Sequence, residues 1–100
     1  MLSKEVKGVL KKNLEIILHD TPSKEILQDL YTEGVISSQE LKSLKKIDED
    51  NDRNFELKQI LETRSDQDFV KFCKILQQYE ATTIATMGRD LEQQVLNCIG

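Results

Sequence analysis

The chain has 100 residues, a formal net charge of −4 and an isoelectric point near 5.0. This acidic balance argues against nucleic acid as the main partner, because binding to the phosphate backbone relies on clustered Lys and Arg. A chain of this length suits one domain and can bury a hydrophobic core without metal ions or disulfide bonds. The charged fraction of 32%, combined with periodic apolar residues, favours a helical domain with a charged surface over a disordered chain.

The cysteine content and the N-terminus both indicate an intracellular protein. Cys73 and Cys98 are too few for a disulfide framework, and Cys73 is expected to be a buried apolar residue. Lys4, Glu5 and Lys7 interrupt any apolar run that could act as a signal peptide. No apolar stretch reaches the length of a membrane span. We therefore expect a reducing, cytoplasmic location and no membrane association.

Two helices are predicted in the first third of the chain. Ser3 can cap a first helix that runs to about Asp20. Thr21 and Pro22 end this helix, because proline is tolerated in the first turn of a helix but not in its interior. With Thr21 as the cap and Pro22 as the first residue, a second helix is predicted to extend to about Glu33.

The middle of the chain contains a glycine turn and two further helices. Gly34 is expected to end the second helix in the left-handed conformation. Ser37 and Glu40 have the spacing of a capping box, which predicts a short third helix. The polar segment 48–52 is expected to form a loop or a helix start, and a fourth helix is predicted over about 52–63.

The fifth predicted helix follows Ser65, a favourable N-cap residue, and is expected to form the centre of the core. Its apolar side chains recur at i, i+3, i+4 and i+7, which places them on one helical face. Aromatic rings bury a large area, so a face that contains two of them is suited to a core position. The residues on this face are Phe69, Phe72, Cys73 and Leu76.

The sixth predicted helix begins at about Thr82 or Thr83 and contains Gly88, which weakens a helix by about 1 kcal/mol relative to alanine. No strand pattern and no internal repeat is found, and all connections are short. The sequence therefore predicts an all-α fold, a six-helix antiparallel bundle. We expect one domain over residues 1–92, with 93–100 as a C-terminal tail or the end of the last helix.

Four segments carry a family resemblance through their order and spacing: residues 10–13, 26–37, 57–64 and 69–76. They resemble, in turn, the first helix, the second helix with its glycine turn, the end of the fourth helix, and the aromatic-x-x-F-x-x-x-L fifth helix of the caspase recruitment domain (CARD). This family belongs to the death-fold superfamily, and the resemblance covers about residues 5–92. The chain departs from the family pattern at Ser65 or Asp66, where many members have glycine, and at Gly88.

The resemblance implies a domain without catalysis that binds another CARD and recruits or assembles apoptotic or inflammatory signalling proteins, such as a caspase, an adaptor or a sensor. It also implies contact between a basic patch on helices one and four and an acidic patch on helices two and three. The basic candidates are Lys7, Lys11, Lys12, Arg53 and Lys58, and the acidic candidates are Glu25, Asp29, Glu33 and Glu40. The presence of both signs would permit a head-to-tail homo-oligomer or filament. A decoy CARD that inhibits assembly remains an alternative.

A second alternative is a calcium-binding helix-loop-helix at residues 48–59. Acidic and amide side chains occupy alternate positions there, as EF-hand ligands do: Asp48, Asp50, Asp52, Asn54 and Glu56. Arg53, however, replaces the glycine of the sixth position, and Gln59 replaces the bidentate glutamate of the twelfth. The site would therefore be weak, and a solvated acidic loop is the preferred interpretation.

An enzymatic function is not expected. His19 is the single histidine, and it cannot be combined with the cysteines or serines into a catalytic set on the basis of spacing. No glycine-rich phosphate loop is present. We therefore predict no catalytic residue, no metal ligand and no cofactor, and we expect His19 to lie on the surface near a helix C-terminus.

Overall fold

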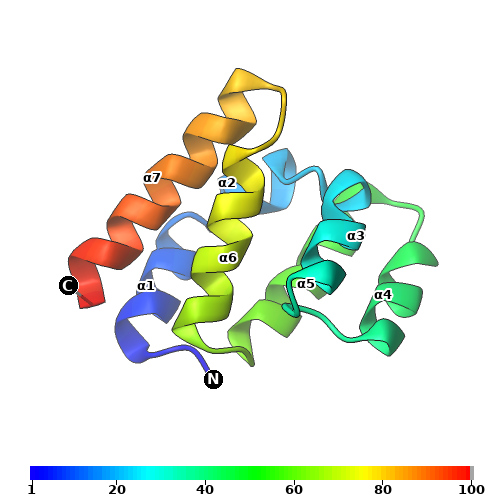
Figure 1. Ribbon diagram of the computed structural model, residues 1–100, viewed down its shortest axis with the longest axis horizontal. Coiled ribbons are helices and arrows are strands. Elements are labelled where there is room, and N and C mark those ends of the chain that lie inside the picture. Colours follow the sequence, from blue (N-terminus) through cyan, green and yellow to red (C-terminus); the bar gives the residue numbers. More distant parts are fainter. Residues whose placement is uncertain (100) are drawn as a thin grey trace.

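The computed structural model describes residues 1–99, which form an all-α fold with no strand in this range (Figure 1). The all-α prediction is therefore confirmed for these residues. Their radius of gyration is 12.3 Å, close to the ~13 Å of a compact chain of this length. The seven helices are α1 (Lys4–Lys12), α2 (Leu14–Asp20), α3 (Ser23–Thr32), α4 (Ser38–Lys45), α5 (Asp50–Glu62), α6 (Asp66–Gln77) and α7 (Thr82–Ile99). Gly100, the end of the predicted 93–100 segment, lies outside the described residues.

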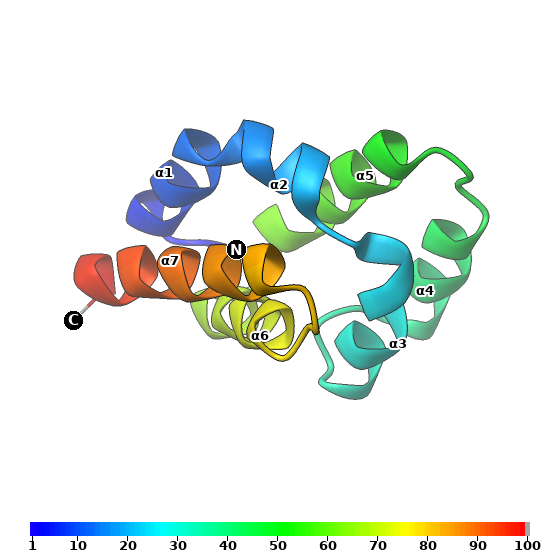
Figure 2. The same cartoon turned by 90° about the horizontal axis from the view of Figure 1, so that it is seen from above.

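The count is seven rather than six because the first predicted helix is interrupted at Asn13. The amide nitrogen Nδ2 of Asn13 donates to the main-chain oxygen of Val9 at 2.7 Å and to Oε1 of Gln94 at 2.9 Å. Asparagine readily leaves a helix because its side chain bonds to nearby backbone groups. The helices on the two sides of this break have different main partners: α1 packs against α7, whereas α2 packs against α5 (Figure 2). The prediction of one continuous helix to Asp20 was wrong.

The junction of α2 and α3 also differs from the expected capping arrangement. Pro22 is the N-cap residue and α3 begins at Ser23, so Thr21 does not cap this helix. Thr21 is instead the C-cap residue of α2, and its side chain is buried. The side-chain nitrogen of Asn54 donates to the main-chain oxygens of Leu18 and Thr21 at 2.7 and 3.0 Å. A buried amide from α5 therefore satisfies carbonyl groups that the end of α2 leaves without a helical partner.

The glycine turn after α3 forms as predicted. Gly34 has a positive φ of 78°, and the N–H groups of Gly34 and Val35 donate to the carbonyls of Tyr31 and Leu30 at 3.0 and 2.9 Å. This pair of bonds is a Schellman motif, which ends a helix with its last carbonyls satisfied. The two apolar residues that usually accompany the motif, here Leu30 and Val35, are both buried in the core.

The predicted capping box of α4 is confirmed, since Ser37 and Glu40 each bond to the other's backbone N–H. Arg64, at the end of α5, ties this box to the preceding turn. Its guanidinium donates to the main-chain oxygen of Val35 at 2.9 Å and pairs with the carboxylate of Glu40. The start of α4 is therefore fixed to α5 as well as to α3.

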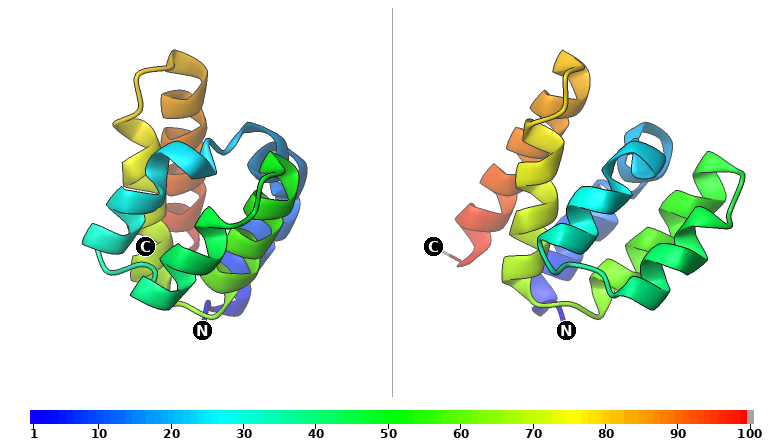
Figure 3. Two further views of the ribbon diagram at one scale, coloured as in Figure 1. Left: turned by 90° about the vertical axis from the view of Figure 1, so that its right-hand side faces the viewer. Right: turned by 45° about the vertical axis from the view of Figure 1, so that its right-hand side comes forward.

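The core is centred on α6, as the sequence predicts. The side chains of Phe69, Phe72, Cys73 and Leu76 are fully buried, and the two phenyl rings lie 5.7 Å apart. α6 packs against α7 on one side and α3 on the other, and α3 lies between α6 and the pair formed by α4 and α5 (Figure 3). Within residues 1–99, no helix has the length and apolar character needed to cross a membrane.

α7 approaches α6 closely at Gly88, in the middle of α7. A Cβ atom at this position would lie 2.6 Å from the carbonyl oxygen of Cys73, 2.7 Å from Cβ of Leu76 and 3.0 Å from the backbone nitrogen of Gln77. These neighbours are mainly the backbone of α6, which cannot move aside as a flexible side chain would. Gly88 therefore weakens α7 as a helix but is required for its contact with α6.

We predict that Gly88→Ala destabilises the fold by about 1–3 kcal/mol, because overpacking outweighs the gain of up to about 1 kcal/mol in helix propensity. The measurement is urea unfolding monitored by circular dichroism. Gly8→Ala is the matched control, because Gly8 lies in α1 with open space around its added Cβ. That variant should be more stable than the parent by about 0.5–1 kcal/mol. A stabilised Gly88→Ala would contradict the close contact.

Candidate functional site

Three of the predicted basic residues come together on one face of the molecule, the basic surface: Lys7, Lys11 and Lys58. Lys7 and Lys11 are one turn apart on α1, so their side chains share a helical face. α5 brings Lys58 to the same place. The three side chains line a hollow of about 250 Å³ together with Leu10, Leu14 and one carboxylate, Glu62. The surface thus combines positive charge with a partly apolar floor.

Lys58 is held by two side chains of its own helix, Glu62 and Phe55. Its ammonium lies 3.2 Å from Oε1 of Glu62, one turn away on α5, and 4.8 Å from the centre of the Phe55 ring. The side chain of Lys58 is 14% exposed, whereas Phe55 is 44% exposed. Lys58 is therefore held in place beside an exposed aromatic residue, while Lys11 is exposed.

The other two predicted basic residues lie elsewhere. Lys12 is exposed but lines a different groove, between α1 and α7, with Gln94. Arg53 is only 4% exposed and does not belong to the basic surface. Its guanidinium donates to the main-chain oxygens of Ile47 and Asp48 at 2.6 and 3.2 Å and to the carboxylate of Asp50 at 2.8 Å. Arg53 fastens the segment between α4 and α5 to the start of α5.

The predicted acidic residues are also divided by the structure. Glu25, Asp29 and Glu33 are exposed and lie at i, i+4 and i+8 along α3 and its C-cap residue, where they form the acidic row. Glu40 is half-buried and paired with Arg64, apart from this row. Burial raises the pKa of the Glu40 carboxyl, but the Ser37 backbone N–H and the Arg64 guanidinium lower it by more, so its pKa lies below the ordinary value of 4.5.

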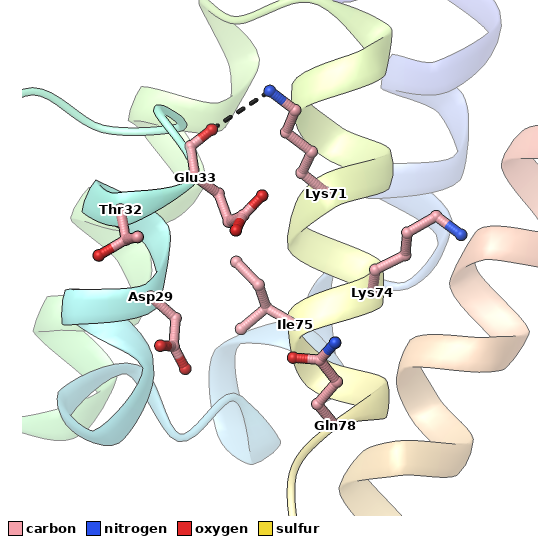
Figure 4. A pocket seen from close by; sticks show the side chains of 7 residues that line it. All are labelled: Asp29, Thr32, Glu33, Lys71, Lys74, Ile75 and Gln78. Carbon is pink, nitrogen blue, oxygen red and sulfur yellow. Dashed lines mark hydrogen bonds between the residues drawn. The ribbon is translucent and has the colours of Figure 1, made fainter.

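The acidic row borders a cleft of about 180 Å³ between α3 and α6 (Figure 4). The side chains of Asp29 and Glu33 lie on the α3 wall, and Ile75 of α6 lies between the walls. Lys71 donates to the main-chain oxygen of Glu33 at 3.2 Å, and Lys74 turns away to pair with Glu92 of α7 at 2.9 Å. The acidic row therefore has an apolar neighbour and a fixed lysine beside it.

The structure does not support the alternative of a calcium-binding loop at residues 48–59. Because α5 begins at Asp50, Asp52 and Glu56 belong to a helix, where alternate residues point in nearly opposite directions. The side chain of Asn54 is buried and used as a hydrogen-bond donor to the end of α2. The described residues contain no group of three side chains arranged to hold a metal ion.

The remaining reactive side chains are dispersed. His19 is exposed near the end of α2, as expected, and Cys98 is exposed on α7. Burial, followed by the negative charge of Glu92, raises the pKa of the Cys73 thiol to about 12, so this thiol remains protonated at neutral pH. None of these groups lines the basic surface or the acidic row.

Comparison of the chain with protein-family models, curated proteins and solved structures finds no match. The candidate site is therefore defined by its own geometry. It consists of the basic surface on α1 and α5 and the acidic row on α3, two groups of opposite charge on different helices.

Glu40 should contribute to the pH dependence of stability. A folded-state pKa below 4.5 adds stability that is present above pH 4.5 and lost as the pH falls through the folded pKa. We predict that Glu40→Gln, which retains the capping geometry but not the charge, is less stable at pH 7 and loses less stability between pH 5 and 3. Urea unfolding across this range measures the difference. Glu25→Gln, on the exposed face of α3, is the control and should retain the parental profile.

Arg53 should act on stability rather than on partner contact. We predict that Arg53→Met destabilises the fold by about 1–3 kcal/mol, because it leaves the partly buried carbonyl groups of Ile47 and Asp48 without their donor. Urea unfolding provides the measurement. Lys46→Met, at an exposed lysine after α4, should stay within about 0.5 kcal/mol of the parent. An equally mild effect of Arg53→Met would argue that its hydrogen bonds are unimportant.

Proposed function

We propose that this chain is a homotypic interaction domain of the death-fold type, similar to the CARD family. In this proposal α1 and α2 together correspond to the first of six helices, broken at Asn13. The domain has no catalytic function. It acts in the cytoplasm by bringing a CARD-containing caspase, adaptor or sensor into an apoptotic or inflammatory complex.

The observation that carries this proposal is that one molecule has a basic surface and, separate from it, an acidic row. α1 and α5 bring Lys7, Lys11 and Lys58 around one hollow. α3 presents the acidic row, and the cleft that contains Ile75 runs beside it. A second domain with the same two surfaces would be complementary to the first on either side.

Such a contact would be heterologous, because the basic surface of one copy meets the acidic row of the next. Heterologous contacts that do not close into a ring propagate into open filaments. Complementary charges mainly raise the association rate and select the partner, and salt weakens them when they are exposed. Recruitment by this domain should accordingly depend on ionic strength.

Charge reversal provides the test. Asp29→Arg removes the centre of the acidic row, and Lys11→Glu removes the most exposed part of the basic surface. We expect each variant alone to lose self-association by at least about 100-fold, since like charges across an interface cost several kcal/mol. An equimolar mixture of the two should form a 1:1 dimer but no larger species, because each variant retains one intact surface. Light scattering over a range of protein and salt concentrations, with electron microscopy of large species, gives the readout.

Lys42→Glu is the matched control, because Lys42 is exposed on α4 outside both surfaces and its reversal should leave assembly unchanged. All variants should unfold at parental urea concentrations. If both reversal variants assemble like the parent, the two-surface contact is wrong. A parent that stays monomeric at every concentration would argue against self-pairing and direct the search to a different CARD with one complementary surface.

A further inference from the structure

The break at Asn13 leaves a groove between α2 and the first turns of α7. α1 lies along α7 and is tied to it through Asn13 and Gln94, whereas α2 turns towards α5 (Figure 2). The groove has a volume of about 360 Å³. It is separate from the basic surface and from the acidic row.

The walls of the groove carry apolar side chains from both helices. Ile16 of α2 is 42% exposed, although its neighbour Ile17 is only 2% exposed. On the other wall, Met87 of α7 is 4% exposed and shows only its edge, beside the exposed Thr82, Thr83 and Thr86. A single exposed isoleucine is ordinary on a protein surface. Here the exposed isoleucine stands at the rim of a hollow and is surrounded by polar residues, an arrangement that can anchor an apolar side chain of another chain.

Two carboxylates accompany these apolar residues. Asp20 lies one turn after Ile16 on α2, and Asp90 lies one turn after Met87 on α7, and both line the groove. Within residues 1–99 neither aspartate forms an ion pair, and no lysine or arginine lines the groove. The groove is therefore complementary to an apolar side chain that is flanked by positive charges.

We propose that this groove binds a short amphipathic helix of a partner protein. Its apolar side chain would pack against Ile16 and the exposed edge of Met87, and its flanking Lys or Arg side chains would reach Asp20 and Asp90. A space between two helices suits the ridge of a third, and an amphipathic helix in a groove is a common mode of peptide recognition. This interaction does not depend on the proposed CARD contact, because it uses different helices.

The test is a titration of the isotope-labelled full chain with a synthetic 14-residue helical peptide of leucine and lysine, with leucines at i, i+3, i+4 and i+7. Amide chemical shifts should change in α2 and the first turns of α7. Ile16→Lys should weaken the peptide's affinity about tenfold or more, since it replaces an apolar contact with a repelling charge. The double variant Asp20→Asn and Asp90→Asn should reduce the salt dependence of binding.

Phe55→Lys is the matched control, since Phe55 has the same degree of exposure as Ile16 on a different helix and should bind the peptide like the parent. Asp29→Arg should also bind normally, which separates this site from the proposed CARD contact. Shift changes centred on the acidic row, or unchanged binding by Ile16→Lys, would overturn the proposal. Self-association of the chain that Ile16→Lys abolishes would overturn it as well, because the groove would then belong to a second copy.

Discussion

The fold depends on the burial of one face of α6 between α3 and α7. Phe69 and Phe72 are fully buried there, and aromatic rings contribute a large share of the apolar area that stabilises a small domain. The contact with α7 is possible because Gly88 allows the two backbones to approach closely. α7 in turn supports α1, and α3 supports α4 and α5. The charged surfaces on α1, α5 and α3 are thus positioned by helices that pack on α6 directly or through α3 or α7.

Local patterns predict those parts of the fold that local chemistry determines. The left-handed Gly34, the capping box at Ser37 and the apolar face of α6 follow from spacing alone, and the structure contains all three. The break at Asn13 does not follow from spacing, because the apolar periodicity continues through it. Its cause is partly tertiary, since the side chain of Asn13 bonds to Gln94, 81 positions away. The need for glycine at position 88 also comes from tertiary structure, because it arises from the contact between α7 and α6.

The candidate site was predicted in part. Lys7 and Lys11 share a face by helical spacing, whereas their meeting with Lys58 depends on how α1 and α5 pack. Arg53 was assigned to the surface because it is charged, although it lies at i, i+4 and i+8 with Leu57 and Leu61, both of which are buried. That periodicity was a usable signal for a buried arginine. The sequence contains no such signal for the groove beside Ile16, because the groove depends on how α2 and α7 are placed relative to each other.

The break at Asn13 also bears on how the N-terminal segment opens and closes. α1 has nine residues and α2 has seven, and isolated helices shorter than ~12–15 residues are only marginally stable in water. Each therefore depends on the helices against which it packs, mainly α7 for α1 and mainly α5 for α2. Two helices that adjoin in sequence thus have their main packing partners in different parts of the chain. In native-state hydrogen exchange, the amides of α1 would open together with the C-terminal helix, and those of α2 with the middle of the chain.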